Sequence, residues 1–311
     1  MKGLHWFILI IVSTYIYSCN SNYQSDSAKP YVVCTTTMIY DALSQILDTT
    51  MYVSTLMHPG MDPHTFKASA GDLKQLKKAD FIIYNGLNLE GKFSETLDEI
   101  SKSGKAIAVT KYLKESDLIY TDGTIPDPHI WFDIPLWQYC IRKTLDEIVM
   151  RFKNQLSAQE IDYIEKNAEK YFLKLTEVHH EALRKFDEIP QEQRVVITAH
   201  DAFNYFGRKY GVEVIGLQGI STASEFGLKD VIEMIHLITE RKIPAIFVES
   251  TVSDHTVKAV IDGCKSKGHT LILGGTLYSD ALGPKGSGHH TLYGAFRHNV
   301  EVIYRSLKTT Y

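Results

Sequence analysis

Four positions in this sequence carry the side chains that a divalent transition metal prefers. The tripeptide Asp-Pro-His occurs twice and ends at His64 and His129, 65 positions apart. A third histidine, His200, lies in Ala-His-Asp, and Asp280 ends the tripeptide Tyr-Ser-Asp. Three imidazoles and one carboxylate fill the tetrahedral shell of a borderline metal ion. The residue types therefore predict a metal site gathered from four distant segments.

Residue type and spacing alone leave a second interpretation open. The chain has 13 histidines, and most histidines in proteins are surface or hydrogen-bonded residues. The preceding proline favours a ligand role at His64 and His129, because proline restricts the backbone just before the imidazole. Neither H-E-x-x-H nor a pair of C-x-x-C motifs occurs. The histidines that we interpret as ordinary are His179, His180, His236, His255, His269 and His298.

The elements that position these residues alternate between strands and helices. Strands are predicted near residues 31–36, 51–56, 81–84, 106–109, 194–198, 212–216, 245–248 and 271–274. Helices are predicted at 38–47, 69–78, 228–241, 253–263 and 292–307. This alternation is typical of α/β folds with parallel sheets. His64, His200 and Asp280 are expected just past the carboxyl ends of strands, where open α/β sheets bind ligands.

One long helix is predicted over residues 157–188. The segment lacks proline and glycine, and its apolar residues recur at gaps of three and four. Ser157 and Glu160 form a capping-box pattern at its start. A helix of this length spans about 45 Å and would connect two lobes rigidly. We therefore predict an N-terminal α/β lobe at 31–152, a bridging helix at 153–189 and a C-terminal α/β lobe at 190–311.

The N-terminus has the pattern of an exported protein. Residues 1–18 contain an apolar run too short to span a bilayer, which predicts a signal peptide. Ile-Tyr-Ser-Cys, ending at Cys19, resembles a bacterial lipobox, so we expect Cys19 to be lipidated and residues 19–30 to form a polar tether. The alternative is an ordinary cleaved signal with an incidental cysteine. The expected location is the periplasm or the outer face of the cytoplasmic membrane.

Composition excludes some classes of partner and site. The 311 residues are 44% hydrophobic and 23% charged, which is normal for a globular protein. The formal net charge of −4 argues against a nucleic-acid partner. Beyond Cys19, the three cysteines Cys34, Cys140 and Cys264 are odd in number and widely spaced, so neither a disulfide framework nor a thiolate metal site is predicted. We expect them to be small buried residues.

Five motifs together resemble one known family. They are Asp-Pro-His-Thr-Phe at 62–66, Asp-Pro-His-Ile-Trp-Phe-Asp at 127–133, Thr-Ala-His-Asp-Ala-Phe at 198–203, Phe-Val-Glu-Ser at 247–250 and Leu-Tyr-Ser-Asp-Ala-Leu-Gly at 277–283. In order and spacing they resemble the cluster A-I solute-binding proteins, the metal-binding lipoproteins of bacterial zinc and manganese ABC importers. The resemblance runs from about residue 31 to about residue 308.

The resemblance implies a metal carrier. In that family the positions matching His64, His129, His200 and Asp280 bind the metal, and one rigid helix bridges two α/β lobes and limits their closure. It implies capture of Zn²⁺ or Mn²⁺ as the transported ligand, without an organic cofactor, and delivery to an ABC permease and its ATPase subunit. We expect a monomer that is not an enzyme and is held at the membrane by its lipid anchor.

The resemblance leaves the metal open. Three imidazoles favour Zn²⁺ over Mn²⁺ or Fe²⁺ on intrinsic affinity. The His-rich loop that zinc importers often carry before the second ligand is absent, because residues 114–126 contain no histidine. Zinc, manganese and ferrous iron therefore all stay open. His289 and His290 are either an auxiliary metal site or, as we favour, part of an exposed loop.

Protonation of the histidines below about pH 6 is expected to release the metal. A further set of acidic residues is expected to orient the imidazoles. These acidic residues are Asp62, Asp127, Asp201 and Glu249. Two other functions compete with transport. A metal-dependent hydrolase needs an open coordination position for water, which four protein ligands do not leave. A surface binding or adhesion lipoprotein would keep the fold and lose transport.

Overall fold

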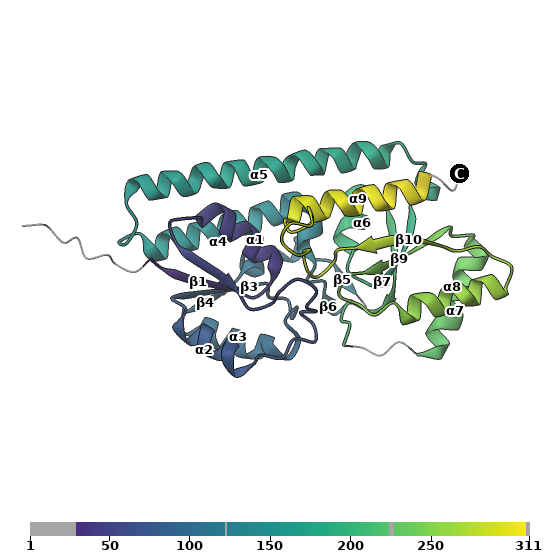
Figure 1. Ribbon diagram of the computed structural model, residues 1–311, viewed down its shortest axis with the longest axis horizontal. Helices are drawn as coiled ribbons and strands as arrows, with labels where there is room; N and C mark the ends of the chain where they lie inside the picture. Colours follow the sequence, from purple (N-terminus) through teal and green to yellow (C-terminus); the bar gives the residue numbers. More distant parts are fainter. Residues whose placement is uncertain (1–28, 122, 224–226, 309–311) are drawn as a thin grey trace, which may run out of the picture.

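The short aliphatic runs of the sequence form two parallel sheets (Figure 1). The computed structural model describes residues 29–121, 123–223 and 227–308. The predicted signal peptide, Cys19 and most of the predicted tether lie outside these residues. Within them, no helix is both long enough and apolar enough to cross a bilayer.

Each sheet has four strands, and every neighbouring pair in it is parallel. The first sheet has the order β2-β1-β3-β4, with β1 (Tyr31–Cys34), β2 (Tyr52–Thr55), β3 (Phe81–Tyr84) and β4 (Ala106–Ala108). The second has the order β10-β9-β7-β8, with β7 (Val195–His200), β8 (Glu213–Gln218), β9 (Ala245–Glu249) and β10 (Ile272–Leu277). A small antiparallel hairpin, β5 (Tyr120–Thr121) and β6 (Ile125–Pro126), precedes Asp127.

Helices cover both faces of each sheet (Figure 1). One layer contains α1 (Thr37–Leu47), α4 (Ile134–Phe152), α5 (Ala158–Asp187), α6 (Asn204–Tyr210) and α9 (Leu292–Lys308). The opposite layer contains α2 (Ala70–Lys78) and α3 (Ser94–Lys102) under the first sheet, and α7 (Leu228–Arg241) and α8 (His255–Ser266) under the second. Short 3₁₀ turns η1 (Gly91–Phe93), η2 (Val109–Tyr112), η3 (Glu115–Asp117), η4 (Ile130–Phe132) and η5 (Gln191–Gln193) complete the connections.

One hydrophobic core extends through both lobes, and each lobe has a further core of its own. Successive residues of β1 point to opposite faces: Val32 and Cys34 pack toward α1 and α5, and Val33 packs toward α2 and α3. The core on the α5 side is continuous from the first sheet to Phe247 and Leu277 of the second. The cores on the other faces stay separate. A continuous packed core resists independent movement of the two lobes.

The long helix begins and ends close to where the sequence predicts. The Ser157 hydroxyl accepts from the Glu160 backbone N–H at 3.2 Å, and the Glu160 carboxylate accepts from the Ser157 N–H at 2.8 Å. This capping box is the predicted one. The helix then runs to Asp187 and buries a stripe that includes Ile164 and Leu175. The predicted two-lobe α/β fold with one long helix is confirmed.

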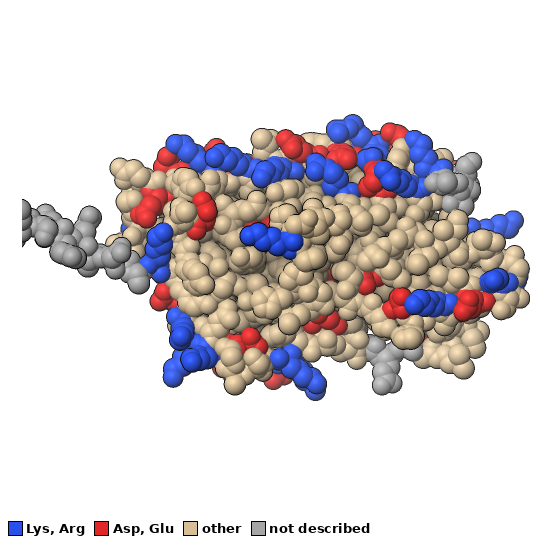
Figure 2. All heavy atoms as spheres, in the orientation of Figure 1, with Lys and Arg blue, Asp and Glu red and all other residues tan. Residues whose placement is uncertain are grey.

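Several local predictions need correction or addition. His64 does not follow a strand directly, because β2 ends at Thr55 and an intervening loop leads to the histidine. The helix ranges predicted above do not include α3, α4 or α6. The three cysteines Cys34, Cys140 and Cys264 are buried and free, as expected. On the face shown in Figure 2, basic side chains lie along α5 and α9 with acidic side chains among them.

Replacing Ser157 with alanine should destabilise the protein by about 1 kcal/mol, because the first turn of α5 loses its cap. Denaturant unfolding followed by circular dichroism measures this. Glu160→Gln is the matched control, since glutamine retains an acceptor for the Ser157 N–H and should change stability by less than about 0.5 kcal/mol. Equal effects of the two changes would contradict the capping role.

Candidate metal site between the lobes

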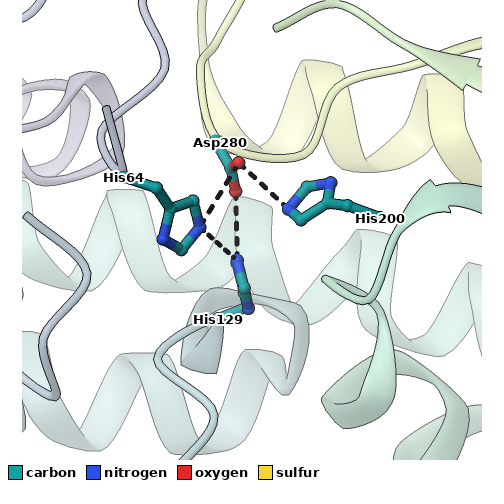
Figure 3. Close-up of side chains that lie close together, drawn as sticks. All are labelled: His64, His129, His200 and Asp280. Carbon is teal, nitrogen blue, oxygen red and sulfur yellow. Dashed lines mark hydrogen bonds and ion pairs between the residues drawn. The ribbon is translucent and has the colours of Figure 1, made fainter. Parts of the chain in front are cut away.

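Four side chains from four segments converge between the two lobes (Figure 3). The Nε2 atoms of His200 and His129 lie 3.1 Å and 3.2 Å from the two oxygens of Asp280. The His64 Nε2 lies 3.7 Å from Asp280 Oδ2 and 3.2 Å from His129 Nε2. All four donor atoms lie within 4.8 Å of one another, and all four residues are buried. The structure therefore brings together the four predicted ligands in a closed cluster.

His129 is held by the aspartate of its own tripeptide. Asp127 Oδ1 accepts from the His129 backbone N–H at 2.8 Å and lies 2.7 Å from its Nδ1. The second oxygen of Asp127 accepts from the Asn204 side chain at 3.1 Å. An imidazole whose Nδ1 donates to a carboxylate presents the Nε2 lone pair on its other side. That lone pair faces the centre of the cluster.

His200 is held in the same way by a residue from a neighbouring strand. It is the last residue of β7, and Glu249 is the last residue of the adjacent strand β9. Glu249 accepts from the His200 backbone N–H at 2.8 Å, and its other oxygen lies 2.6 Å from the ring Nδ1. The carboxyl ends of two parallel strands thus place the imidazole and its carboxylate together.

The loop after β3 supports the two histidines of the first lobe. The Asn85 side chain donates to the Pro128 carbonyl at 3.0 Å, just before His129. The buried Glu90 carboxylate accepts from the Asn85 backbone N–H at 2.6 Å. Gly91, at φ +52°, lies so close to His64 that a Cβ there would be 2.2 Å from the His64 carbonyl oxygen. Only glycine permits this approach.

Two of the four expected orienting acids contact an imidazole. Asp127 and Glu249 do so, as described. Asp62 instead accepts from the His64 backbone N–H at 2.9 Å and from the Thr222 hydroxyl of the other lobe at 2.6 Å. Asp201 bonds to the Asn204 side chain, which in turn donates to Asp127. The spacing of residues in the sequence did not predict that Asn204 and Thr222 contact these acidic residues.

Asp280 is the one negative charge that faces all three imidazoles. Among the described residues, no hydroxyl or backbone N–H donates to either of its oxygens. Burial raises the pKa of Asp280, but the His200 and His129 imidazoles outweigh burial and hold the pKa well below its ordinary value. A buried carboxylate without a positive partner is strongly unfavourable. The cluster therefore requires positive charge, from protons or from a cation.

The three imidazoles differ in proton affinity. Burial, together with repulsion from the other two imidazoles, lowers the pKa of His64 to about 4 despite the attraction of Asp280. Burial also opposes charge on His129, but Asp127 and Asp280 reverse its effect and raise the pKa to about 9. Glu249 and Asp280 likewise raise the pKa of His200 above its ordinary value against burial. Protons and a metal ion therefore compete for His129 and His200.

His289 and His290 do not form a second cluster of metal donors within the described part of the chain. The His289 Nδ1 lies 3.2 Å from the Tyr278 hydroxyl, and the centroid of its ring lies 4.3 Å from that of the His298 ring, with the two planes tilted by 50°. His290 is exposed.

Comparisons with known proteins find similar metal-binding proteins. The family model described as ZnuA, zinc-uptake complex component A, periplasmic, matches residues 32–306. Manganese-binding lipoprotein MntA of Bacillus subtilis is 45% identical over 278 residues, which cover 89% of each chain. Zinc-binding protein TroA of Treponema pallidum is 38% identical over 279 residues, 90% of this chain and 89% of that protein. The solved structure of TroA superposes with a TM-score of 0.85 and covers 90% of this chain and 99% of that chain.

Replacing Glu249 with glutamine should weaken Zn²⁺ binding by about 10- to 100-fold, because the carboxylate no longer fixes the His200 tautomer and basicity. Competition with a chromophoric chelator measures the affinity. Glu213→Gln is the matched control: Glu213 lies in the same sheet but is exposed and pairs with Arg241. An unchanged affinity in Glu249→Gln would contradict the orienting role.

Proposed function

Because this chain belongs to the family of zinc-uptake complex component A, periplasmic, we propose that it captures one divalent transition metal ion outside the cytoplasm for delivery to an ABC permease. The single observation that carries the proposal is the closed cluster of three buried imidazoles around one buried carboxylate. Such a donor set fits Zn²⁺, Mn²⁺ or Fe²⁺. In this proposal His64, His129, His200 and Asp280 are the ligands.

The donor geometry supports carriage of a metal more than catalysis with one. A catalytic metal keeps an open position for water or substrate. Here four side-chain donors surround a common centre and are buried. We propose that the protein is a binding component and not an enzyme. We also propose that Cys19 carries a lipid anchor, that the lobes divide at the predicted boundaries and that the protein is a monomer. Its proposed partners are a permease and the ATPase subunit of that permease.

The names of the relatives indicate that the bound ion is zinc or manganese. A MntA protein at 45% identity is described as manganese-binding, and a TroA protein at 38% as zinc-binding. Nitrogen donors bind Zn²⁺ more tightly than Mn²⁺ in general. We propose that the isolated protein binds Zn²⁺ more tightly, whichever ion it carries in the cell.

The full-length protein should bind one Zn²⁺ per chain, and His129→Ala should weaken binding by at least about 100-fold, because it removes a ligand and the imidazole that Asp127 holds. Equilibrium dialysis with elemental analysis gives both the ratio and the loss. His236→Ala is the control, because His236 is exposed on α7, outside the cluster. Wild-type protein without bound metal, or full binding by His129→Ala, would contradict the proposal.

Metal affinity should rise with pH between about 6 and 9. In the metal-free protein the pKa of His129 is raised to about 9, so its imidazole carries a proton at pH 7, and the pKa of His200 is raised in the same direction. Binding must displace protons from the ligands, which gives about a tenfold gain in affinity per pH unit for each proton released. Isothermal titration calorimetry in buffers of different ionisation enthalpy counts the protons. A pH-independent affinity would argue against protonated imidazoles.

A further inference from the structure

The segment that carries Asp280 leaves the second sheet just before this residue. Strand β10 ends at Leu277, whose carbonyl accepts from the Ser250 N–H at 3.0 Å as the last of these sheet contacts. Tyr278 is then held by the Asn299 side chain of α9, through its backbone N–H at 2.9 Å and its carbonyl at 2.7 Å. On either side of Asp280, at Ser279 and Leu282, the side chains that hold the backbone come from the first lobe.

Three buried hydrogen bonds attach this segment to the first lobe. The Trp131 indole N–H donates to the Ser279 carbonyl at 3.0 Å, directly before Asp280. The Leu282 backbone N–H donates to the Thr37 hydroxyl at 2.9 Å, two residues after Asp280. At the far end of the segment, the Leu292 N–H donates to the Asp41 carboxylate at 2.8 Å.

The residues of α1 that make these contacts are themselves firmly placed. Thr37 is the first residue of α1 and follows β1 at the carboxyl edge of the first sheet. Asp41 also accepts from the Tyr171 hydroxyl of α5 at 3.1 Å and from the Gln45 side chain at 2.7 Å. Each anchor is therefore tied into the shared core and not to a surface loop.

His200 has the opposite attachment. It lies within β7, and Glu249 at the end of β9 holds both its backbone N–H and its ring. These two strands belong to the second sheet. By contacts, then, His64, His129 and Asp280 belong to the first lobe, although Asp280 belongs to the second by chain order.

We propose that Thr37 and Asp41 are positioning residues that keep Asp280 on the first lobe, so that His200 is the one ligand carried by the second lobe. This inference rests on the proposed function, since it assigns roles within the metal site. The first lobe then presents a preassembled site of two imidazoles and one carboxylate. Any relative movement of the lobes adds or withdraws a single ligand and changes coordination between three and four protein donors.

The test is the Zn²⁺ affinity of full-length variants, measured by chelator competition with Zn²⁺ alone as the probe. Thr37→Val leaves the Leu282 N–H without its buried acceptor, and we expect the dissociation constant to rise about tenfold. Thr37→Ser restores the hydroxyl and should return the constant to within about threefold of wild type. Thr144→Val is the matched control, because Thr144 is equally buried but bonds only within α4 to the Cys140 carbonyl.

A double-mutant cycle separates positioning from a general loss of stability. In an Asp280→Asn background, Thr37→Val should add less than about twofold, because Thr37 acts through the missing carboxylate. In a Glu249→Gln background it should add its full effect of about tenfold, because Glu249 acts through His200. A merely structural role would add equally in both backgrounds.

The outcomes are distinct from a failure of the proposed function. Wild-type protein that binds no Zn²⁺ would overturn the proposed function, and this inference with it, before any variant is compared. Wild-type binding together with an unchanged affinity in Thr37→Val, or with equal losses in Thr37→Val and Thr144→Val, would overturn the inference alone. If Thr37→Val does not fold, Thr37→Ala removes the same acceptor with less bulk and is judged by the same criteria.

Discussion

The buried negative charge of Asp280 is the constraint on which the rest of the site depends. A carboxylate this far from water is stable only beside positive charge, and three imidazoles face it while other donors in the described structure do not. The negative charge of Asp280 is therefore compensated in both states, by protons on the imidazoles when no metal is bound and by the metal ion when one is. Metal and protons become alternatives for the same lone pairs, which links metal binding to the surrounding pH.

Two further carboxylates convert histidines into ligands of fixed orientation. Asp127 and Glu249 each bind both the backbone N–H and the ring Nδ1 of one histidine, so the residue is fixed at two points. Each lobe contains one such pair of a carboxylate and a histidine. In the first lobe both residues belong to one tripeptide after β6, and in the second lobe they end two neighbouring strands. Within residues 29–121, 123–223 and 227–308, no carboxylate holds the ring Nδ1 of His64, and this imidazole has the lowest pKa of the three.

Sequence patterns predicted the elements whose period is long enough to be distinctive. The long helix, its capping box at Ser157 and the two-lobe α/β fold are present as predicted. The four cluster residues were also found, since repeated Asp-Pro-His and the family motifs identify them. The contacts of Thr37, Asp41 and Asn204 could not be predicted, because they join segments distant in sequence through single hydrogen bonds. The seven-residue helix α6 presents too few turns for a clear period.

The continuous core beneath α5 also bears on how the protein loses its structure. Side chains of both sheets pack against the same helices, so neither lobe has a complete interior of its own. Partial unfolding of one lobe would expose apolar surface belonging to the other, and cooperative units of stability follow such shared packing. Heat or denaturant should therefore melt the described body as one unit. Cargo bound between the lobes would stabilise both together.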